Sequence, residues 1–452
     1  MTVQVDHDGA KILARLDRIP VWALPTRYLV IIGLGYFFTF FDIANIGVAM
    51  PAISKQFHLS DNESLFVALA IGLVGYILGS LAIGPLADHF GRYRLLILTI
   101  TLTAIGSFGD AAAQGLISLV LFRFITGAGV GADLNLVSTY IGELAPASRR
   151  GRVTVGTFLV GILGQAVTPF VALALVPNYS FGWRLLFAIG GVIAVIGLLL
   201  RFELPESPRW QVLHERLNGA DETVKRMEFA CRSRGIRLPE PPPDPPVSRA
   251  PTLGVRSLFH TPYARRLTLL IPMWFMWYIG NYGFLGDTAT LLSAHGLTVS
   301  STILFLAIGA VGYPVGALLM MMVVDRFDRR LTLLGSSAIW LIGMILIGWA
   351  GSDAAVTAGS FLAALALGMF LQGAYTFTAE SFPTRARSSG FAMSDGIGHL
   401  GGAVGALLLP VTVSQLSFFA GFAIIGMTGL LAGLLAVAGP VTTNRRLEHI
   451  SI

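Results

Sequence analysis

The sequence predicts an all-α membrane protein in which twelve transmembrane helices form two six-helix repeats. Three observations support this prediction. The chain of 452 residues is 54% hydrophobic and only 12% charged, which is about half the charged fraction of a typical soluble domain. Its apolar residues gather into twelve runs, each near the roughly 20 residues that a helix needs to cross a bilayer. Charged motifs of the first half recur in the second at a constant offset. This composition excludes a soluble globular enzyme.

The apolar runs are separated by short polar connections, with one exception at residues 205–264. That stretch contains a charged segment of helical pattern, Gln211–Arg232, and then a proline-rich run at 239–246, which favours extended polyproline geometry. We expect a polar tail at 1–26, a six-helix half at 27–204, a linker at 205–264, a second half at 265–439 and a tail at 440–452. The twelve runs lie near 27–53, 65–87, 93–113, 115–142, 153–176, 182–204, 265–292, 298–324, 331–350, 353–380, 387–411 and 414–439.

The distribution of Lys and Arg residues predicts the orientation of the chain. Of the 31 basic residues, 28 fall on one side, in the tails, in the linker, in connections or at the adjoining ends of the runs. Lys55 and Arg184 lie on the opposite side, and Arg123 lies inside a run. Since cytoplasmic loops are enriched in Lys and Arg, we expect both termini and the linker on the cytoplasmic side of the bacterial inner membrane. The formal net charge of +6 then reflects topology, and no nucleic-acid partner is expected.

Several further features narrow the class of protein. The N-terminal tail carries three aspartates and lacks the pattern of a cleavable signal peptide, so the first apolar run is expected to act as span and targeting signal. The single cysteine, Cys231, excludes an intramolecular disulfide. The sequence has no P-loop signature and no Cys/His cluster with zinc spacing, so we expect no metal and no other cofactor. Too few charges lie within the spans for a hydrolytic site, so an enzyme is not expected, and an ion gradient is the expected energy source.

An internal repeat relates the two halves. The segment 88–94, Asp-His-Phe-Gly-Arg-Tyr-Arg, recurs at 325–331 as Asp-Arg-Phe-Asp-Arg-Arg-Leu. The Glu-Leu-Ala-Pro segment at 143–146 recurs at 380–383 as Glu-Ser-Phe-Pro, and the arginine that follows each segment recurs as well. Every matched position is shifted by the same 237 residues. Structural repeats of this kind are expected of secondary transporters that rock one half against the other.

At these motifs the chain resembles the major facilitator superfamily, and the resemblance covers nearly its whole length. The segment Gly84–Arg94 is similar to the superfamily signature between helices 2 and 3, although its second-half copy has Asp328 where glycine is usual. Pro205–Trp210 (Pro-Glu-Ser-Pro-Arg-Trp) and Arg123–Gly131 are similar to the branch of sugar porters and metabolite–proton symporters. The resemblance implies the major facilitator fold and transport by alternating access.

The start of helix 7 indicates which branch of the superfamily the chain resembles. Sugar porters carry paired glutamines there, whereas this chain has the aromatic-rich segment Trp274–Tyr282. Together with Gly131–Leu134 in helix 4, this segment looks more like bacterial symporters of organic acids and nicotinate-type metabolites. Gln165 in helix 5, however, matches a sugar-porter binding position. The resemblance therefore leaves a sugar or polyol carrier open.

Ionisable side chains within the apolar runs are candidates for proton coupling, because a charge in a bilayer is costly and needs a reason. The resemblance implies that Asp42 and Arg123 form a pair whose protonation is linked to alternating access; a static pair that fixes helix packing is the alternative. Asp133 is a second candidate, unless it is a capped or water-exposed carboxylate. Asp395 and His399 are four residues apart and can interact directly, as a proton relay or a carboxylate receptor requires; a structural histidine is the alternative.

Polar and aromatic residues at helical spacing are candidates for substrate binding. In helix 7, four of them share one face that suits stacking on a planar ring with a few directed hydrogen bonds. Helices 1, 5 and 10 add further polar side chains. Helix–helix packing is the alternative interpretation. The candidates are Asn45, Gln165, Trp274, Tyr278, Asn281, Tyr282, Gln372 and Tyr375.

The repeated charges at the cytoplasmic ends are candidates for a gate. The resemblance implies ion pairs of Asp88 with Arg92, of Glu143 with Arg150 and of Glu380 with Arg387, which stabilise the outward-open state. Arginines that only set the topology would not explain acids that recur in register. The second-half counterparts of Asp88 and Arg92 are Asp325 and Arg329.

These observations favour a proton-coupled symporter of a small organic acid or of a nicotinate-like aromatic metabolite. A sugar or polyol proton symporter and an exporter of a small organic compound are alternatives, and a membrane sensor with a transporter fold is an alternative of another class. The expected partners are a small-molecule substrate, protons and the lipid bilayer, and a monomer is expected.

Overall fold

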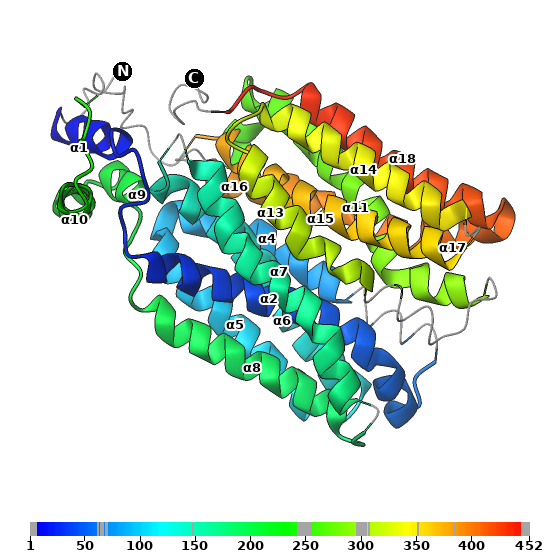
Figure 1. Ribbon diagram of the computed structural model, residues 1–452. Coiled ribbons are helices and arrows are strands. Elements are labelled where there is room, and N and C mark those ends of the chain that lie inside the picture. Colours follow the sequence, from blue (N-terminus) through cyan, green and yellow to red (C-terminus); the bar gives the residue numbers. More distant parts are fainter. Residues whose placement is uncertain are drawn as a thin grey trace.

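In the computed structural model, two bundles of long helices lie side by side, and short helices gather at the end of the molecule where both chain termini lie (Figure 1). The structure describes residues 7–60, 63, 67, 71–146, 149–176, 178–241, 255–294, 305, 308–349, 352–383 and 386–443. Every long regular element in these ranges is a helix. The predicted all-α class is confirmed.

The first bundle contains the helices of the N-terminal half, and the second contains those of the C-terminal half. The first comprises α2 (Thr26–Phe57), α4 (Ile71–Phe90), α5 (Arg92–Ala112), α6 (Leu116–Leu144), α7 (Arg150–Leu175) and α8 (Gly182–Arg201). The second comprises α11 (Tyr263–Ala294), α13 (Gly312–Val323), α14 (Arg329–Trp349), α15 (Asp353–Glu380), α16 (Arg387–Gly398), α17 (Leu400–Gln415) and α18 (Phe418–Val437).

Ten helical stretches among the described residues are long and apolar enough to cross a membrane, and α16 with α17 forms one of them. The helices α11 and α13 occupy the positions of the seventh and eighth predicted runs. Most residues at the starts of the runs 65–87 and 298–324 lie outside the described residues, as do Pro242–Pro246 of the proline-rich run and the C-terminal tail beyond residue 443.

Local sequence signals mark several helix starts. The Ser352 and Ser417 hydroxyls accept the backbone N–H groups of Ala355 and Ala420 and so begin α15 and α18, as serine does at the position before a helix. The short helix α9 (Pro208–Leu213) begins in the same way after Ser207, with proline in its first turn.

The two copies of the repeated motif turn the chain in different ways. Between α4 and α5, Gly91 has φ of 101°, and a Cβ built there would lie 2.3 Å from the Glu206 carboxylate, so glycine is required. At the matching position before α14, the carboxylate of Asp328 accepts the backbone N–H of Arg330 at 3.0 Å. A side-chain hydrogen bond thus replaces the glycine in the second half.

Two further helices, α1 (His7–Asp17) and α10 (Leu217–Ser233), lie beside α9 at the end with the termini (Figure 1). The predicted helical segment 211–232 is thus divided between α9 and α10. Arg15 and Arg18 of the N-terminal segment both reach Glu228 of α10, with closest N–O distances of 2.8 and 2.6 Å. Burial raises the pKa of Glu228, but the hydrogen bonds from these arginines outweigh burial and leave the pKa below its ordinary value. Charge pairing therefore fastens α1 to the linker.

Candidate functional site

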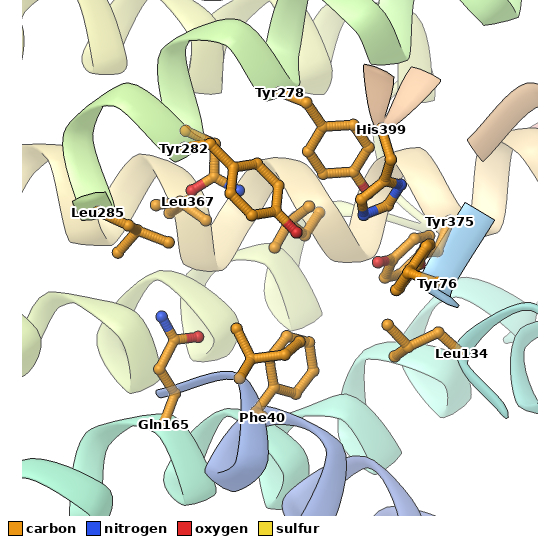
Figure 2. A pocket seen from close by; sticks show the side chains of 13 residues that line it. Phe40, Tyr76, Leu134, Gln165, Tyr278, Tyr282, Leu285, Leu367, Tyr375 and His399 are labelled. Carbon is orange, nitrogen blue, oxygen red and sulfur yellow. The ribbon is translucent and has the colours of Figure 1, made fainter. Parts of the chain in front are cut away.

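A cavity lies between the two bundles and is partly open to solvent. Figure 2 shows Phe40 and Gln165 of the first bundle across the cavity from Tyr278, Tyr282 and His399 of the second. The residues that line it are Phe40, Ile43, Tyr76, Leu134, Gln165, Tyr278, Asn281, Tyr282, Leu285, Leu367, Leu371, Tyr375 and His399. A largely apolar cavity with a few polar groups is the usual form of a small-molecule site.

The His399 imidazole lies between two tyrosine rings. Its centroid is 3.8 Å from that of Tyr76 and 3.7 Å from that of Tyr278. Nδ1 lies 2.8 Å from the backbone carbonyl oxygen of Asp395. A carbonyl oxygen only accepts, so Nδ1 carries the hydrogen, and Nε2 is the nitrogen that can meet a ligand.

The Asp395 carboxylate is buried behind this histidine. It accepts the hydroxyls of Tyr76 and Tyr278, each at 2.7 Å, while His399 Nδ1 lies 3.6 Å from its Oδ2 atom. The expected direct interaction of His399 with Asp395 is thus a hydrogen bond to the backbone and a longer contact with the carboxylate. Because Tyr76 belongs to α4 and Asp395 to α16, this carboxylate joins the two bundles.

Five of the eight substrate-binding candidates line the cavity: Gln165, Tyr278, Asn281, Tyr282 and Tyr375. Asn281 Oδ1 is buried and has no hydrogen-bond partner among the described residues. This atom is therefore placed to accept a hydrogen bond from a ligand.

The other three candidates do not line the cavity. Trp274 stacks on Tyr278 with an interplanar angle of 18° and donates its indole N–H to Thr378, so it supports the wall from behind. Asn45 and Gln372 are buried, and their side-chain amides have no hydrogen-bond partner within the described part of the chain. The predicted role of these three in binding has no support from the shape of the cavity.

Tyr76 is a cavity residue that the sequence reasoning missed. It is an aromatic residue with a hydroxyl in the middle of an apolar run, and a buried tyrosine hydroxyl usually finds a partner. That rule was a signal that could have found it. The leucines, Phe40 and Ile43 gave no such signal, because apolar residues in a span face lipid, neighbouring helices and cavities alike.

Asp42 and Arg123 lie together, as expected, but a third ionisable group joins them. Arg123 Nη1 lies 3.2 Å from the carboxylate of Asp42 and 3.5 Å from that of Asp110 near the end of α5. Ser107 donates to Asp42, and Thr126 donates to Asp110, each at 3.3 Å. The sequence reasoning missed Asp110, although a carboxylate inside the run 93–113 was a signal of the same kind as Asp42.

Asp133 lies in a different environment. Its two carboxylate oxygens accept both terminal nitrogens of Arg201 at 2.5 and 2.7 Å, and Thr99 donates to it at 2.6 Å. Arg201 is one of the basic residues that the sequence places on the cytoplasmic side, and it is fully buried at the end of α8. Asp133 is thus held in a bidentate pair with one arginine.

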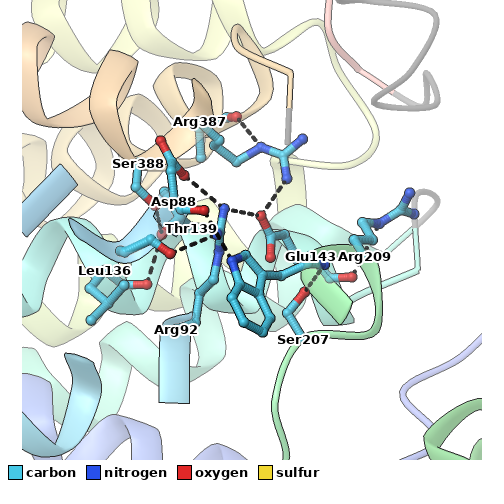
Figure 3. A network of polar contacts seen from close by, with 12 residues as sticks. Asp88, Arg92, Leu136, Thr139, Glu143, Ser207, Arg209, Arg387 and Ser388 are labelled. Atoms are coloured by element: carbon cyan, nitrogen blue, oxygen red, sulfur yellow. Dashed lines mark hydrogen bonds and ion pairs between the residues drawn. The ribbon is translucent and has the colours of Figure 1, made fainter. Parts of the chain in front are cut away.

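The repeated charges form ion pairs that cross between the bundles (Figure 3). Glu143 pairs with Arg92 at 2.9 Å and with Arg387 of the other half at 3.1 Å. Glu380 pairs with Arg150 of the other half at 3.1 Å and, also at 3.1 Å, with Arg329. Asp88 pairs with Arg92 as expected, at 2.9 Å.

The partners of Glu143 and Glu380 are therefore exchanged relative to the expected pairs Glu143–Arg150 and Glu380–Arg387. The physical reason is that each arginine begins a new helix after a turn, and that helix packs against the opposite bundle. Sequence proximity does not constrain such contacts.

The two repeat aspartates complete this pattern. Asp88 accepts the backbone N–H of Ser389 near the start of α16 at 3.2 Å. Asp325 accepts the backbone N–H groups of Gly151 and Arg152 near the start of α7 at 3.0 and 2.8 Å. Each aspartate thus holds the positive end of a helix from the other half. We call the contacts of α4 with α16 and of α7 with α13 the inner seam.

Two family models match the chain: one for sugar (and other) transporters over residues 28–234, and one for the major facilitator superfamily over residues 288–449. The chain is 30% identical to the putative metabolite transport protein YyaJ of Bacillus subtilis, over 98% of each chain. It is 27% identical to the niacin transporter NiaP of Acinetobacter baylyi, over 98% of this chain and all of the relative. Among solved structures, the proton:xylose symporter XylE bound to 6-bromo-6-deoxy-D-glucose matches with a TM-score of 0.77 at 21% identity, covering 98% of this chain and 99% of that one.

Proposed function

This chain belongs to the major facilitator superfamily, a class of multi-pass membrane transporters of small metabolites that are not enzymes, and from this premise we propose that it is a proton-coupled symporter of a small aromatic or heteroaromatic carboxylate. The observation that carries the proposal is the position of His399 between the rings of Tyr76 and Tyr278 at the wall of the cavity.

The cavity suits a planar ring that bears a carboxylate. Tyr282 and Tyr375 line the cavity and offer ring surfaces for offset or edge-to-face stacking. When His399 is protonated, both of its ring nitrogens donate, so Nε2–H can bind a carboxylate while Nδ1–H stays on the Asp395 carbonyl. The amides of Gln165 and Asn281 can direct hydrogen bonds to a heteroatom. The NiaP relative is a niacin transporter, and niacin belongs to this class of compound.

A sugar or polyol is the second candidate substrate. Gln165 and Asn281 line the cavity together with several tyrosines, and such groups also suit a ring of hydroxyls. The sugar-transporter family model that matches residues 28–234 favours this candidate.

For the coupling ion, the buried pair of Asp42 and Arg123 supports a proton-binding role. A carboxylate that is removed from water and held by a cation can change its protonation when the cation moves. Asp133 is a weaker candidate, since its bidentate contact with Arg201 satisfies its charge. We propose that Asp395 and His399 link substrate binding to proton binding, because His399 lines the cavity and contacts Asp395.

The crossed ion pairs of Glu143, Arg150, Glu380 and Arg387 support a gate that holds the cytoplasmic side closed. They lie at the end of the molecule with the termini, which the distribution of basic residues assigns to the cytoplasm. Inward opening must break them.

We propose that the protein imports its substrate as a monomer in the bilayer.

The test combines ligand binding with transport. Thermal-shift measurements on the purified protein should show stabilisation by nicotinate or benzoate and weaker stabilisation by nicotinamide, which has the same ring without the charge. Stabilisation by xylose or glucose alone would favour the second candidate. In proteoliposomes, an imposed pH gradient should drive uptake of the stabilising compound, and binding without any flux would favour a sensor.

A matched variant separates recognition of the carboxylate from folding. His399→Asn should weaken nicotinate binding about tenfold or more, the value of a hydrogen bond to a charged group, and should change nicotinamide binding little. An equal loss for both ligands would indicate that His399 only shapes the wall.

A further inference from the structure

Two carboxylates share one guanidinium in the first bundle. Nη1 of Arg123 contacts Asp42 of α2 at 3.2 Å and Asp110 of α5 at 3.5 Å, and all three side chains are at least nine-tenths buried. We propose that Asp110 is part of the proton site, so that Asp42 and Asp110 together hold one transported proton around Arg123. This inference rests on the proposed proton coupling and names the residue that completes its site.

The count of charges supports a shared proton. With both carboxyl groups ionised, the cluster has a net charge of −1 within the membrane-spanning part of the bundle, which is costly. A single proton on either carboxyl group makes the cluster neutral, as when two carboxylates share one site. The two successive steps of proton binding then belong to the two carboxyl groups together, and neither step is assigned to one residue alone.

The bidentate pair of Asp133 and Arg201 provides an internal contrast. There, one carboxylate meets one guanidinium through two short hydrogen bonds of 2.5 and 2.7 Å, so the pair is neutral without a proton. Around Arg123, by contrast, one nitrogen faces both acids at longer distances. The first bundle thus contains one ion pair that is neutral without a proton and one cluster that becomes neutral when it takes up a proton.

The surroundings of Asp110 leave a place for the proton. Its Oδ1 atom is buried and has no hydrogen-bond partner among the described residues, while Oδ2 accepts the hydroxyl of Thr126. A protonated carboxyl group carries its hydrogen on one oxygen, and Oδ1 is the oxygen that no donor occupies. Ser107 donates to Asp42 in the corresponding way.

The helices packed around the pair contribute few other charges. From α8, Arg184 donates to the backbone carbonyl of Ala111 at 2.8 Å, and the ring of Phe187 lies 6.0 Å from the Arg123 guanidinium carbon. From α4, Gly72 approaches Arg123 with no side chain of its own. Among the described residues, Arg123 is therefore the cation in contact with both carboxyl groups, whereas Arg184 is bound to a backbone carbonyl.

The helix α2 connects the proton site to the cavity. Phe40 and Ile43 of α2 line the cavity, and Asp42, between them in sequence, points to the other side of the helix toward Arg123. A shift of α2 on ligand binding therefore changes the distance from Arg123 to Asp42 relative to its distance to Asp110. When Arg123 lies between both, the proton can leave the carboxyl oxygen for water on the open side, and the two carboxylates then share the cation.

The test uses the full chain in proteoliposomes, with nicotinate or another compound that stabilises the protein and with the membrane potential clamped at zero. Under this clamp, a gradient of one pH unit drives about tenfold accumulation per symported proton. In Asp110→Asn, the remaining pair of Asp42 and Arg123 is neutral without a proton. In this variant the substrate should only equilibrate across the membrane and not accumulate, while exchange of labelled for unlabelled substrate should continue. Asp42→Asn should behave in the same way.

Controls separate the possible failures. If the wild-type protein itself shows no proton-driven accumulation, the proposed function fails. If the wild-type protein accumulates substrate and Asp110→Asn accumulates it equally, only the role of Asp110 is overturned. Exchange activity reports that Asp110→Asn has folded. If it has not folded, Asp110→Glu keeps the carboxyl group but moves it, and should accumulate substrate with a shifted pH profile; an unchanged profile would overturn the inference.

Discussion

The hydroxyl of Tyr76 donates a hydrogen bond of 2.7 Å to the carboxylate of Asp395, 319 residues further along the chain. This bond connects the first bundle to the second at the wall of the cavity. Tyr278 makes a bond of equal length to the same carboxylate, but from within the second bundle. The two tyrosines therefore form a matched pair in which one bond crosses the halves and the other does not.

Tyr76→Phe should favour opening of the cytoplasmic side, because it removes a hydrogen bond between the halves and keeps the ring against His399. A hydrogen bond to a charged group contributes about 1.5–3 kcal/mol, so the population of the inward-open state should rise about tenfold or more. Maleimide labelling of Ser388→Cys, in a Cys231→Ser background, measures this opening, since Ser388 is buried in the inner seam. Tyr278→Phe is the control and should leave labelling unchanged; equal effects of the two variants would show that the bond between the halves has no special role.

The exchanged ion pairs predict which side chains are coupled energetically. A double-mutant cycle with Glu143→Gln and Arg387→Gln should give a coupling energy of about 0.5–3 kcal/mol, the range for contacting residues. The labelling of Ser388→Cys is the measurement for each variant of the cycle. A cycle with Glu143→Gln and Arg150→Gln should be close to additive. If the second cycle showed the larger coupling, the sequential pairing within one half would be correct instead.

Gly84→Ala should prevent full closure of the inner seam. A Cβ at Gly84 would lie 2.9 Å from three atoms of α16, two of which belong to the backbone, and overpacking of this kind costs about 1–3 kcal/mol. Labelling of the seam cysteine should increase, even though alanine favours the helix itself. Gly156→Ala is the control across the same seam, because its nearest neighbour, Met321 Sδ, would lie 3.8 Å away; an equal increase there would contradict the steric argument.

The contact of α1 with α10 should weaken in acid. The pKa of Glu228 is held below its ordinary value by Arg15 and Arg18 against the opposing effect of burial. Such a carboxylate stabilises the contact fully above its ordinary pKa of about 4.3, and the stabilisation is lost as the pH falls through the lowered value. Hydrogen exchange of the amides of residues 7–17, corrected for intrinsic rates, should therefore be slow near neutral pH and faster in acid. Glu228→Gln should show the fast exchange already at neutral pH and little further change in acid.

Much of the fold could be predicted, because the thickness of a bilayer fixes the length of each span and the repeated motif fixes the division into halves. The cavity was partly predictable for a related reason. Polar side chains in apolar runs need partners, and Gln165, Asn281 and His399 stood out on that ground. Asn45 did not fit, since it lies only two residues after Ile43 and therefore faces nearly the opposite side of α2.

The contacts between the halves could not be predicted from spacing. Helical periodicity constrains which residues meet within one helix, but Glu143 and Arg387 are 244 residues apart and meet only when the bundles pack. The repeat predicted that both residues belong to the gate, but it did not predict which acid pairs with which arginine. Asp110 is different, because the cost of a buried charge was sufficient reason to single it out.

The cluster of two acids around one guanidinium has an electrical consequence. If it is neutral when protonated and carries one negative charge when empty, a carrier that moves a carboxylate anion is equally charged in its loaded and empty forms. Its cycle then moves no net charge, and the membrane voltage leaves its accumulation ratio unaffected. With an uncharged sugar, the loaded form is neutral and the empty form is negative. A voltage of 100 mV would then contribute about 2.3 kcal/mol for each full charge that crosses the field. Current recorded during transport would thus distinguish the two substrate classes.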